Sequence, residues 1–112
     1  MTKEDDGALV VVLVNSPPAD APRIAKALVE QKLAACVNVI PGVKSFYFWE
    51  GALQEDEEST LVVKTTAASV QRLTKAVKEL HPYSVPEVVA LPLKNAGNAD
   101  YLDWVRKSIA GA

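Results

Sequence analysis

The chain of 112 residues contains only one cysteine, Cys36, and one histidine, His81. A single cysteine excludes an internal disulfide and any zinc site built from several cysteines. A single histidine leaves little for general acid–base catalysis near neutral pH. The chain also lacks a Ser–His–Asp order, a phosphate-binding glycine loop and an HExxH pattern. The sequence therefore predicts a protein without enzymatic activity.

Long apolar runs and clustered charge are absent too. No segment approaches the roughly 18 apolar residues of a membrane helix. The net charge is −2 and the basic residues are scattered, which argues against binding to nucleic acid or to an anionic membrane. Residues 1–7 are polar and acidic, unlike the basic and then apolar layout of a secretion signal. We expect a flexible N-terminus over residues 1–7, one domain over residues 8–112, and a cytoplasmic protein.

Hydrophobic patterning predicts strands and helices in alternation. Valine-rich or alternating apolar runs indicate strands, and apolar residues spaced three and four apart indicate helices. The strands are expected at residues 8–14, 37–49, 61–64 and 88–93, with a bend or bulge at Pro41-Gly42. The helices are expected from Asp20 to about Lys32, from Thr66 to Leu80, and from Asn98 or Asp100 onward.

This order predicts an α+β fold. Two strand–helix–strand units joined by a hairpin form the ferredoxin-like split βαβ motif, a βαββαβ sandwich, here followed by a C-terminal helix. The sheet would be antiparallel, with helices on one face. The other face would be left without cover.

Four of the seven aromatic residues are consecutive, from Phe46 to Trp49. Neighbours on a strand point to opposite faces, so Phe46 and Phe48 would face one way and Tyr47 and Trp49 the other. Each large aromatic side chain can bury about 150–250 Å². Rings on both faces need cover on both faces, and a second copy of the chain is the simplest source. A base-stacking platform for RNA is the alternative, which the acidic balance disfavours.

Five short motifs resemble the CutA divalent-cation-tolerance family, and the resemblance runs from about Leu9 to Ile109. The motifs are residues 33–36 (LAAC), 47–51 (YFWEG), 64–66 (KTT), 81–83 (HPY) with Pro86-Glu87, and 100–104 (DYLDW). The resemblance implies a ferredoxin-like homotrimer similar to the PII signalling proteins. It also implies an association with tolerance of copper and other divalent metals, with no established enzymatic activity.

Metal ligands are carried over only in part. Copper-binding members of that family place a cysteine just after the first strand, where this chain has Asn15, and can place a histidine at the position of Leu80. His81 remains a candidate copper(II) ligand because imidazole suits copper, with Cys36 as a further soft donor. The alternatives are a histidine favoured by the dipole at a helix end and a cysteine that acts as a small hydrophobe.

Charged residues suggest a second kind of site. The acidic run Glu55–Glu58, together with Glu50, fits a solvated hairpin tip better than a calcium loop. Lys64 should need a carboxylate partner, Glu87 or Glu50. The resemblance implies a polar cleft between subunits lined by four residues: Trp49, Lys64, Tyr83 and Glu87. A structural salt bridge is the alternative for Lys64, and a PII-like small-molecule sensor or a structural interaction module are the alternatives for function.

Overall fold

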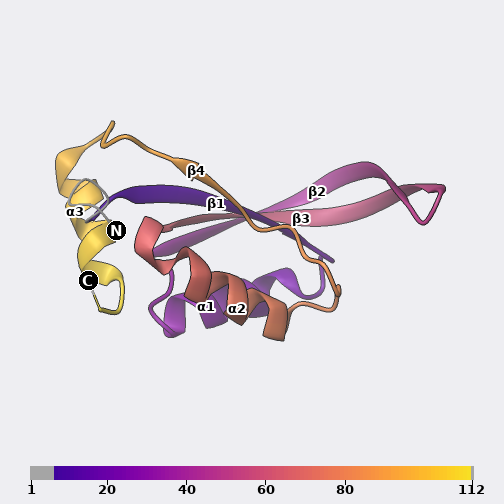
Figure 1. Cartoon of the computed structure of the whole chain (residues 1–112), viewed down its shortest axis with the longest axis horizontal. Helices are drawn as coiled ribbons and strands as arrows, with labels where there is room; N and C mark the ends of the chain where they lie inside the picture. Colours follow the sequence, from indigo (N-terminus) through magenta and orange to yellow (C-terminus); the bar gives the residue numbers. More distant parts are fainter. Residues whose placement is uncertain (1–6, 112) are drawn as a thin grey trace.

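The computed structural model describes residues 7–111, which form a four-stranded antiparallel sheet with three α-helices (Figure 1). The expected flexible segment, residues 1–7, lies outside the described residues apart from Gly7. The strands are β1 (Leu9–Ser16), β2 (Cys36–Trp49), β3 (Ala52–Thr66) and β4 (Val89–Pro92); the helices are α1 (Ala21–Glu30), the short 3-10 helix η2 (Ala67–Ser69), α2 (Val70–Leu80) and α3 (Ala99–Ser108). The strand order is β2-β3-β1-β4 and every pairing is antiparallel. The predicted ferredoxin-like α+β fold is confirmed.

Helices α1 and α2 lie on one face of the sheet (Figure 1). Their apolar stripes meet alternate residues of the two central strands, since side chains one apart on a strand face opposite ways. The fully buried members of this core are Val12, Val14, Leu61 and Val63 from the sheet and Ile24, Leu28, Leu73 and Val77 from the helices. Burial of each such side chain contributes about 1.5–3 kcal/mol.

The boundaries of the helices follow local chemistry. Helix α2 ends at Leu80, as the following His81-Pro82 predicts. Asn98 caps α3 by accepting a hydrogen bond from the backbone N–H of Asp100 at 3.0 Å. Asp20 precedes α1, but its carboxylate accepts a hydrogen bond from Arg23 at 2.9 Å and caps no backbone N–H. Within residues 7–111 no helix is long and apolar enough to cross a membrane.

The opposite face of the sheet is largely uncovered. Only its end near β1 residue Leu9 is covered, by Leu102 and Val105 of α3. The remaining apolar side chains on this side form what we call the open sheet face: Val11, Leu13, Ile40, Val62, Val89 and Leu91. Ile40, Val89 and Leu91 are each nearly half exposed. The expected bare face is thus present, with α3 as a partial cover at one end.

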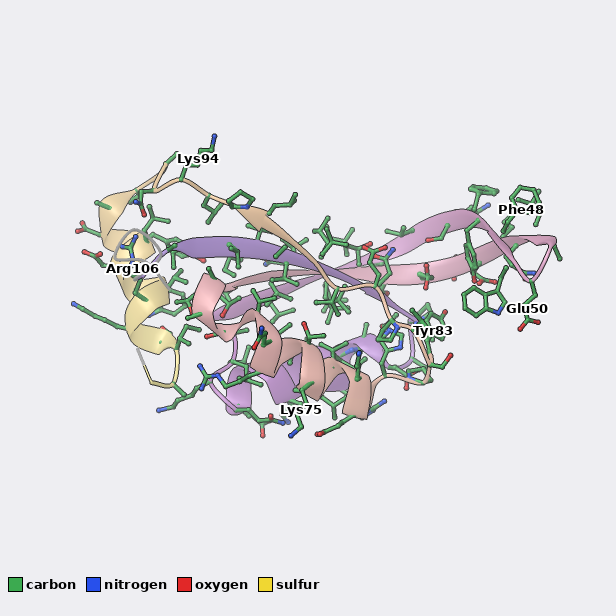
Figure 2. The ribbon with its side chains drawn as sticks, viewed as in Figure 1. Phe48, Glu50, Lys75, Tyr83, Lys94 and Arg106 are labelled. Atoms are coloured by element: carbon green, nitrogen blue, oxygen red, sulfur yellow. The ribbon has the colours of Figure 1, made fainter. Side chains whose placement is uncertain are left out.

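Strands β2 and β3 form a long hairpin that extends well beyond the helices (Figures 1 and 2). Their pairing runs from Cys36 opposite Lys64 to Trp49 opposite Ala52. The acidic run Glu55–Glu58 therefore lies inside β3, and the prediction that it forms the hairpin tip is wrong. The tip is Glu50-Gly51 alone. Glu55 and Glu57 are tolerated in this strand because they are open to water, whereas the buried Glu58 accepts a hydrogen bond from the hydroxyl of Tyr83.

A β-bulge at Pro41-Gly42 sets which aromatic ring points where. Ile40 pairs with Thr60, whereas the next pair is Val43 with Glu58, so β2 holds one extra residue. The extra residue shifts the alternation of β2 relative to β3. Tyr47 and Trp49 consequently share a side with Glu58, while Phe46 and Phe48 lie on the other. Both the bulge and the alternation agree with the sequence prediction.

Candidate functional site

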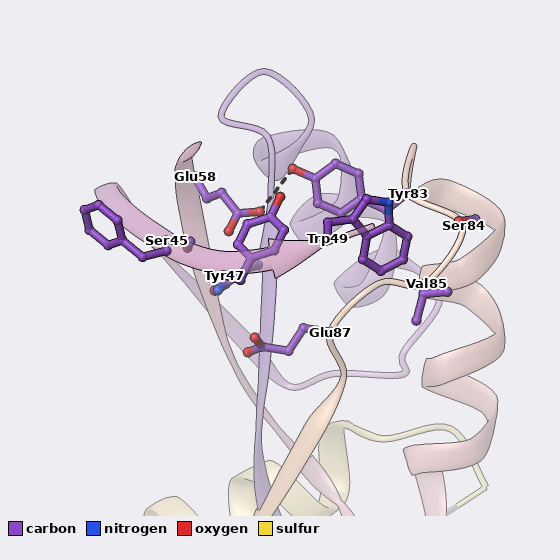
Figure 3. A pocket seen from close by; sticks show the side chains of 10 residues that line it. Ser45, Tyr47, Trp49, Glu58, Tyr83, Ser84, Val85 and Glu87 are labelled. Carbon is purple, nitrogen blue, oxygen red and sulfur yellow. Dashed lines mark hydrogen bonds between the residues drawn. The ribbon is translucent and has the colours of Figure 1, made fainter. Parts of the chain in front are cut away.

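A cavity of about 670 Å³ lies alongside the β2–β3 hairpin, lined from Glu58 near its base to Trp49 beside its tip (Figure 3). It lies on the same side of the sheet as the open sheet face, and the segment between α2 and β4 borders it. Its lining comes from three strands and the connecting segment: Asn15 of β1, Ser45, Phe46, Tyr47 and Trp49 of β2, Glu58 of β3, and Tyr83, Ser84, Val85 and Glu87 of the segment. A cavity of this volume is in the range of small-molecule sites.

Tyr83 joins the connecting segment to β3. Its phenolic hydroxyl donates a hydrogen bond to Oε2 of Glu58 at 3.1 Å. Burial first, and then this bond to Glu58, raise the pKa of Tyr83 to about 12. Tyr83 therefore remains a neutral hydrogen-bond donor at physiological pH. Glu58 is only 5% exposed, so the bond is made at the inner wall of the cavity.

The electrostatic character of the cavity is acidic. Burial first, and then the charge of Glu58, raise the pKa of Glu87. On the same side of the hairpin, Tyr47 donates a hydrogen bond to Asp56, and this bond is the largest cause of the raised pKa of Tyr47. Among residues 7–111, no lysine, arginine or histidine lines the cavity or forms an ion pair with Glu58 or Glu87.

His81 lies behind the wall of the cavity and is 7% exposed. Its Nε2 is 2.7 Å from the carbonyl oxygen of Asn15, and its Nδ1 accepts the backbone N–H of Tyr83 at 3.1 Å. A carbonyl can only accept and an N–H can only donate, so Nε2 carries the proton and Nδ1 presents its lone pair. His81 therefore ties the connecting segment to β1, and its ring also contacts that of Tyr83, with centroids 4.7 Å apart.

Lys64 does not line this cavity. Within residues 7–111 its ammonium donates to the side-chain amide oxygen of Asn38 on β2, and it forms no ion pair with either expected carboxylate partner, Glu87 or Glu50. Lys64 lies six residues along β3 from Glu58, a separation of about 20 Å. Of the four predicted cleft residues, the chain brings Trp49, Tyr83 and Glu87 together and leaves Lys64 out.

Sequence reasoning missed Asn15, Tyr47 and Glu58 as lining residues. A signal for Glu58 was present, because alternation traced back from Val62 through Thr60 places it on the open side of β3. The run of four acidic residues obscured this alternation.

The family comparison agrees with this geometry. The model of the CutA1 divalent ion tolerance proteins matches residues 9–108. The chain belongs to this family. The divalent-cation tolerance protein CutA of Thermus thermophilus is 54% identical over 99 residues, which are 88% of this chain and 95% of that protein. Protein CutA 1, chloroplastic, of Oryza sativa is 47% identical over 100 residues, which are 88% of this chain and 56% of that longer protein.

Solved structures of CutA proteins show the same fold. The Oryza sativa CutA1 crystal structure has a TM-score of 0.90 at 42% identity, and the match covers 94% of this chain and 96% of that one. A protein from Nostoc sp. PCC 7120, described as PII-like CutA, has a TM-score of 0.83 at 39% identity, with 88% and 95% covered. This CutA chain therefore shares its architecture with proteins of the PII-like kind.

The family name raises the question of whether these residues fit a copper ion. His81 has both ring nitrogens engaged, so a metal ion there would have to replace one of its two hydrogen bonds. Cys36 pairs with Lys64, whereas Asn15, which holds His81, pairs with Thr60. Four residues of β3 separate these pairs, about 13 Å, so His81 and Cys36 cannot share one ion within this chain.

Other donors do not complete a copper site. Asn15, at the family's cysteine position, lies within β1, and its side-chain oxygen accepts the hydroxyl of Thr60 at 2.7 Å. Across residues 7–111, no group of three or more His, Cys, Asp or Glu side chains is arranged to hold a metal ion. The residues of one chain thus do not fit a copper site at His81.

Proposed function

We propose that this chain works as a non-enzymatic homotrimer in the tolerance of divalent cations. The observation that carries the proposal is the exposure of the four aromatic rings, which are 63%, 38%, 73% and 50% exposed from Phe46 to Trp49. The rings lie on both sides of the hairpin, and the open sheet face adds further exposed apolar side chains. Large exposed apolar patches are typical of surfaces that contact another chain. Burial between copies removes this surface from water.

The mass of the protein in solution tests the assembly. Light scattering during size-exclusion chromatography should give three times the 12.0 kDa of one chain. A monomer at micromolar concentration would overturn the proposal. The cellular role is tested by growth of a bacterium without its own cutA gene on copper or zinc, with and without this chain. If the chain does not improve growth on these metals, the role in tolerance is rejected and only the proposal of a trimer remains.

Direct binding of copper(II) is the finer form of this proposal. Calorimetric titration of the wild type and of His81→Ala with copper tests this form, since the variant lacks the imidazole. Loss of copper binding in this variant would support a copper site at His81, where the ion replaces one of the two hydrogen bonds of the ring. Binding that persists in the variant, or no binding at micromolar copper, rejects that site.

A small-molecule sensor is the second candidate, and the 670 Å³ cavity is the observation that favours it. In the assembled form, Trp49, Tyr83 and Glu87 of one subunit and Lys64 of another would line a cleft. Thermal-shift screening tests this candidate, because a ligand that binds only the folded state raises the melting temperature. Lys64→Ala should reduce that shift if Lys64 joins the cleft.

We place this function in the cytoplasm. The name of the Thermus thermophilus relative states no organelle, whereas the rice relative carries a chloroplastic name. Fractionation of the cells that encode the chain, followed by immunoblotting, tests this location.

A further inference from the structure

The two helices that cover the sheet carry basic side chains that lie far apart in the sequence. The start of α1 lies beside the end of α2, because Arg23 donates to the carbonyl oxygen of Leu80 at 2.9 Å. At the other end, Ala110 joins the two helices: its N–H donates to the carbonyl of Lys32 at 2.9 Å, and its carbonyl accepts from Arg72 at 3.2 Å. The outward surface, which we call the basic helical face, has six exposed cations: Arg23, Lys26, Lys32, Arg72, Lys75 and Lys78.

Neighbouring carboxylates neutralise only part of this charge. Arg23 forms an ion pair with Asp20 at 2.9 Å, and the ammonium of Lys26 lies 4.0 Å from Glu30. Within residues 7–111 the other four cations form no ion pair: Lys32, Arg72, Lys75 and Lys78. Among the residues of α1 and α2, Glu79 is the one further carboxylate. The basic helical face therefore has an excess of three positive charges, although the whole chain has a net charge of −2.

The basic helical face is separate from the surfaces assigned to the trimer and to the cavity. It lies on the side of the sheet opposite the open sheet face (Figure 1). Lys75 points away from the sheet (Figure 2). The acidic residues of the chain gather elsewhere, in the hairpin that extends beyond the helices, which holds Glu50 and the run 55–58. The proposed trimer therefore leaves the basic helical face open to a partner with negative charge.

Two kinds of negatively charged partner fit this face poorly. Neither helix contains an aromatic residue on which a nucleic-acid base could stack. A long strand of nucleic acid would also continue from the helices onto the acidic hairpin. Helices that bind a membrane surface place an apolar face in the lipid, whereas the apolar stripes of α1 and α2 are buried against the sheet.

The size of the face favours a short partner segment. Helix α1 has 10 residues and α2 has 11, so the face is about 15 Å long. About five residues of an extended polypeptide span this length. Aspartate and glutamate side chains on such a segment would meet cations from both helices.

We propose that the basic helical face docks a short acidic segment of a partner polypeptide. The carboxylates of the segment contact Lys75 and Lys78 of α2 and the cations beside them. These contacts are exposed to water, so the binding is weak and falls with ionic strength. The inference goes beyond the proposed function, because it uses neither the cavity nor the role in metal tolerance.

A nuclear magnetic resonance titration of the full chain tests the proposal, with hexaglutamate as the probe and hexaglutamine as the uncharged control. At low ionic strength, hexaglutamate should shift the amide signals of α1 and α2, with a dissociation constant below about 1 mM. Salt at about 1 M, where the Debye length is about 3 Å, should abolish the shifts. Equal shifts with hexaglutamine, shifts confined to residues outside the helices, or no saturable shift would overturn the proposal.

Matched charge variants locate the contact. Lys75 and Lys94 are both exposed and lie on opposite sides of the molecule (Figure 2). Lys75→Glu should weaken hexaglutamate binding about fivefold or more, and Lys94→Glu should change it less than about twofold. Lys75→Gln removes the charge without reversing it and should give a smaller loss, which keeps the test valid if Lys75→Glu does not fold. Equal losses in Lys75→Glu and Lys94→Glu would indicate attraction by net charge alone and would reject the site.

Competing partners are tested on the same samples. Oligothymidylate of the same charge and vesicles that contain phosphatidylserine should bind more weakly than hexaglutamate. Tighter binding of either would make a nucleic acid or a membrane the occupant and overturn the proposal. Light scattering without a probe tests a further copy of the chain. A mass above that of a trimer, which Lys75→Glu reduces to a trimer, would make the acidic hairpin of another copy the occupant and overturn the proposal.

Discussion

The Nε2–H of His81 donates a hydrogen bond to the carbonyl oxygen of Asn15, 66 residues earlier, at 2.7 Å. Since Nδ1 of the same ring accepts the N–H of Tyr83, one neutral imidazole joins β1 to the segment that follows α2. That segment carries Tyr83 and Glu87 to the cavity. The only histidine of this chain therefore has a structural role, the two hydrogen bonds of its ring, without any metal.

Replacement of His81 by phenylalanine should lower the free energy of unfolding by about 1–3 kcal/mol. The change keeps a planar ring but leaves the carbonyl of Asn15 and the N–H of Tyr83 without their partner, and unsatisfied buried groups cost about this much. Urea unfolding at a fixed protein concentration measures the effect. Lys78→Ala, at an exposed position of α2, is the control and should stay within about 0.5 kcal/mol of wild type. A loss no greater than that of the control would mean that the two bonds contribute nothing.

Much of this fold could be predicted from the sequence. The period of the apolar residues located β1, α1 and α2, and Pro41-Gly42 marked the bulge. The start of β3 was missed because acidic residues are rare in strands of a packed sheet. In this chain β3 begins beyond the helices. There the backbone of β3 pairs with β2, and no helix packs on the strand to require apolar side chains.

The site was harder to predict than the fold. Trp49, Tyr83 and Glu87 line one cavity of this chain, although they come from segments more than 30 residues apart. The cleft between subunits stays a prediction. The partner of Lys64 could not be inferred, because a sequence does not state which residue of β2 lies beside it. The register places Asn38 near the lysine and keeps the lysine about 20 Å from Glu58.

Glu87→Gln should stabilise the protein at neutral pH and lose this advantage in acid. The pKa of Glu87 is raised above its ordinary 4.5 by burial and by the charge of Glu58. In the pH range just above 4.5 the folded state therefore binds more protons than the unfolded state, so wild-type stability falls as pH rises through this range. The neutral amide of Glu87→Gln does not lose stability in this way. The gain in the free energy of unfolding over wild type is less than about 1 kcal/mol, because Glu87 is mostly exposed.

Melting temperatures at about pH 4 and about pH 7 measure the effect of Glu87→Gln. The exposed Glu57→Gln variant, away from the cavity, is the matched control and should show a smaller change between these pH values. A Glu87→Gln variant that is less stable than wild type at neutral pH would contradict the prediction.

Gly42→Ala should destabilise the chain by about 1–2 kcal/mol, although there is room for the added methyl group. The φ angle of Gly42 is +74°, and no atom lies within 4 Å of a Cβ built there. The cost is therefore conformational, since left-handed backbone is unfavourable for alanine. Gly42→Asn should cost less, because asparagine adopts this region more readily. Equal losses for the two variants in urea unfolding would assign the effect to something other than φ.

Phe48→Ser should weaken the proposed trimer. Phe48 is 73% exposed near the end of the hairpin, on the side away from the cavity, so the change leaves the ligand walls in place (Figure 2). Burial of a phenylalanine contributes about 1.5–3 kcal/mol, and each subunit would lose this amount. Sedimentation equilibrium should detect lighter species at micromolar concentration, and Trp49→Ala should have the same effect.

Val29→Ser is the control for these assembly variants. Val29 is 41% exposed on α1, on the helical side of the sheet, and should not take part in the contact. Dissociation by Val29→Ser as well would point to a general loss of stability. An unchanged mass of Phe48→Ser at every concentration would place the subunit contact elsewhere.

Glu50→Asn should stabilise the hairpin by about 0.5–1 kcal/mol. Glu50 and Gly51 connect Trp49 directly to Ala52, and both have positive φ, 51° and 79°. A two-residue hairpin loop with two positive φ angles is the type I′ turn, which Asn-Gly adopts best, whereas a glutamate is strained there. Glu55→Asn is the control, since it removes a charge from the same acidic hairpin at a strand position. If urea unfolding shows the same gain for Glu55→Asn, relief of charge repulsion, and not of backbone strain, is the cause.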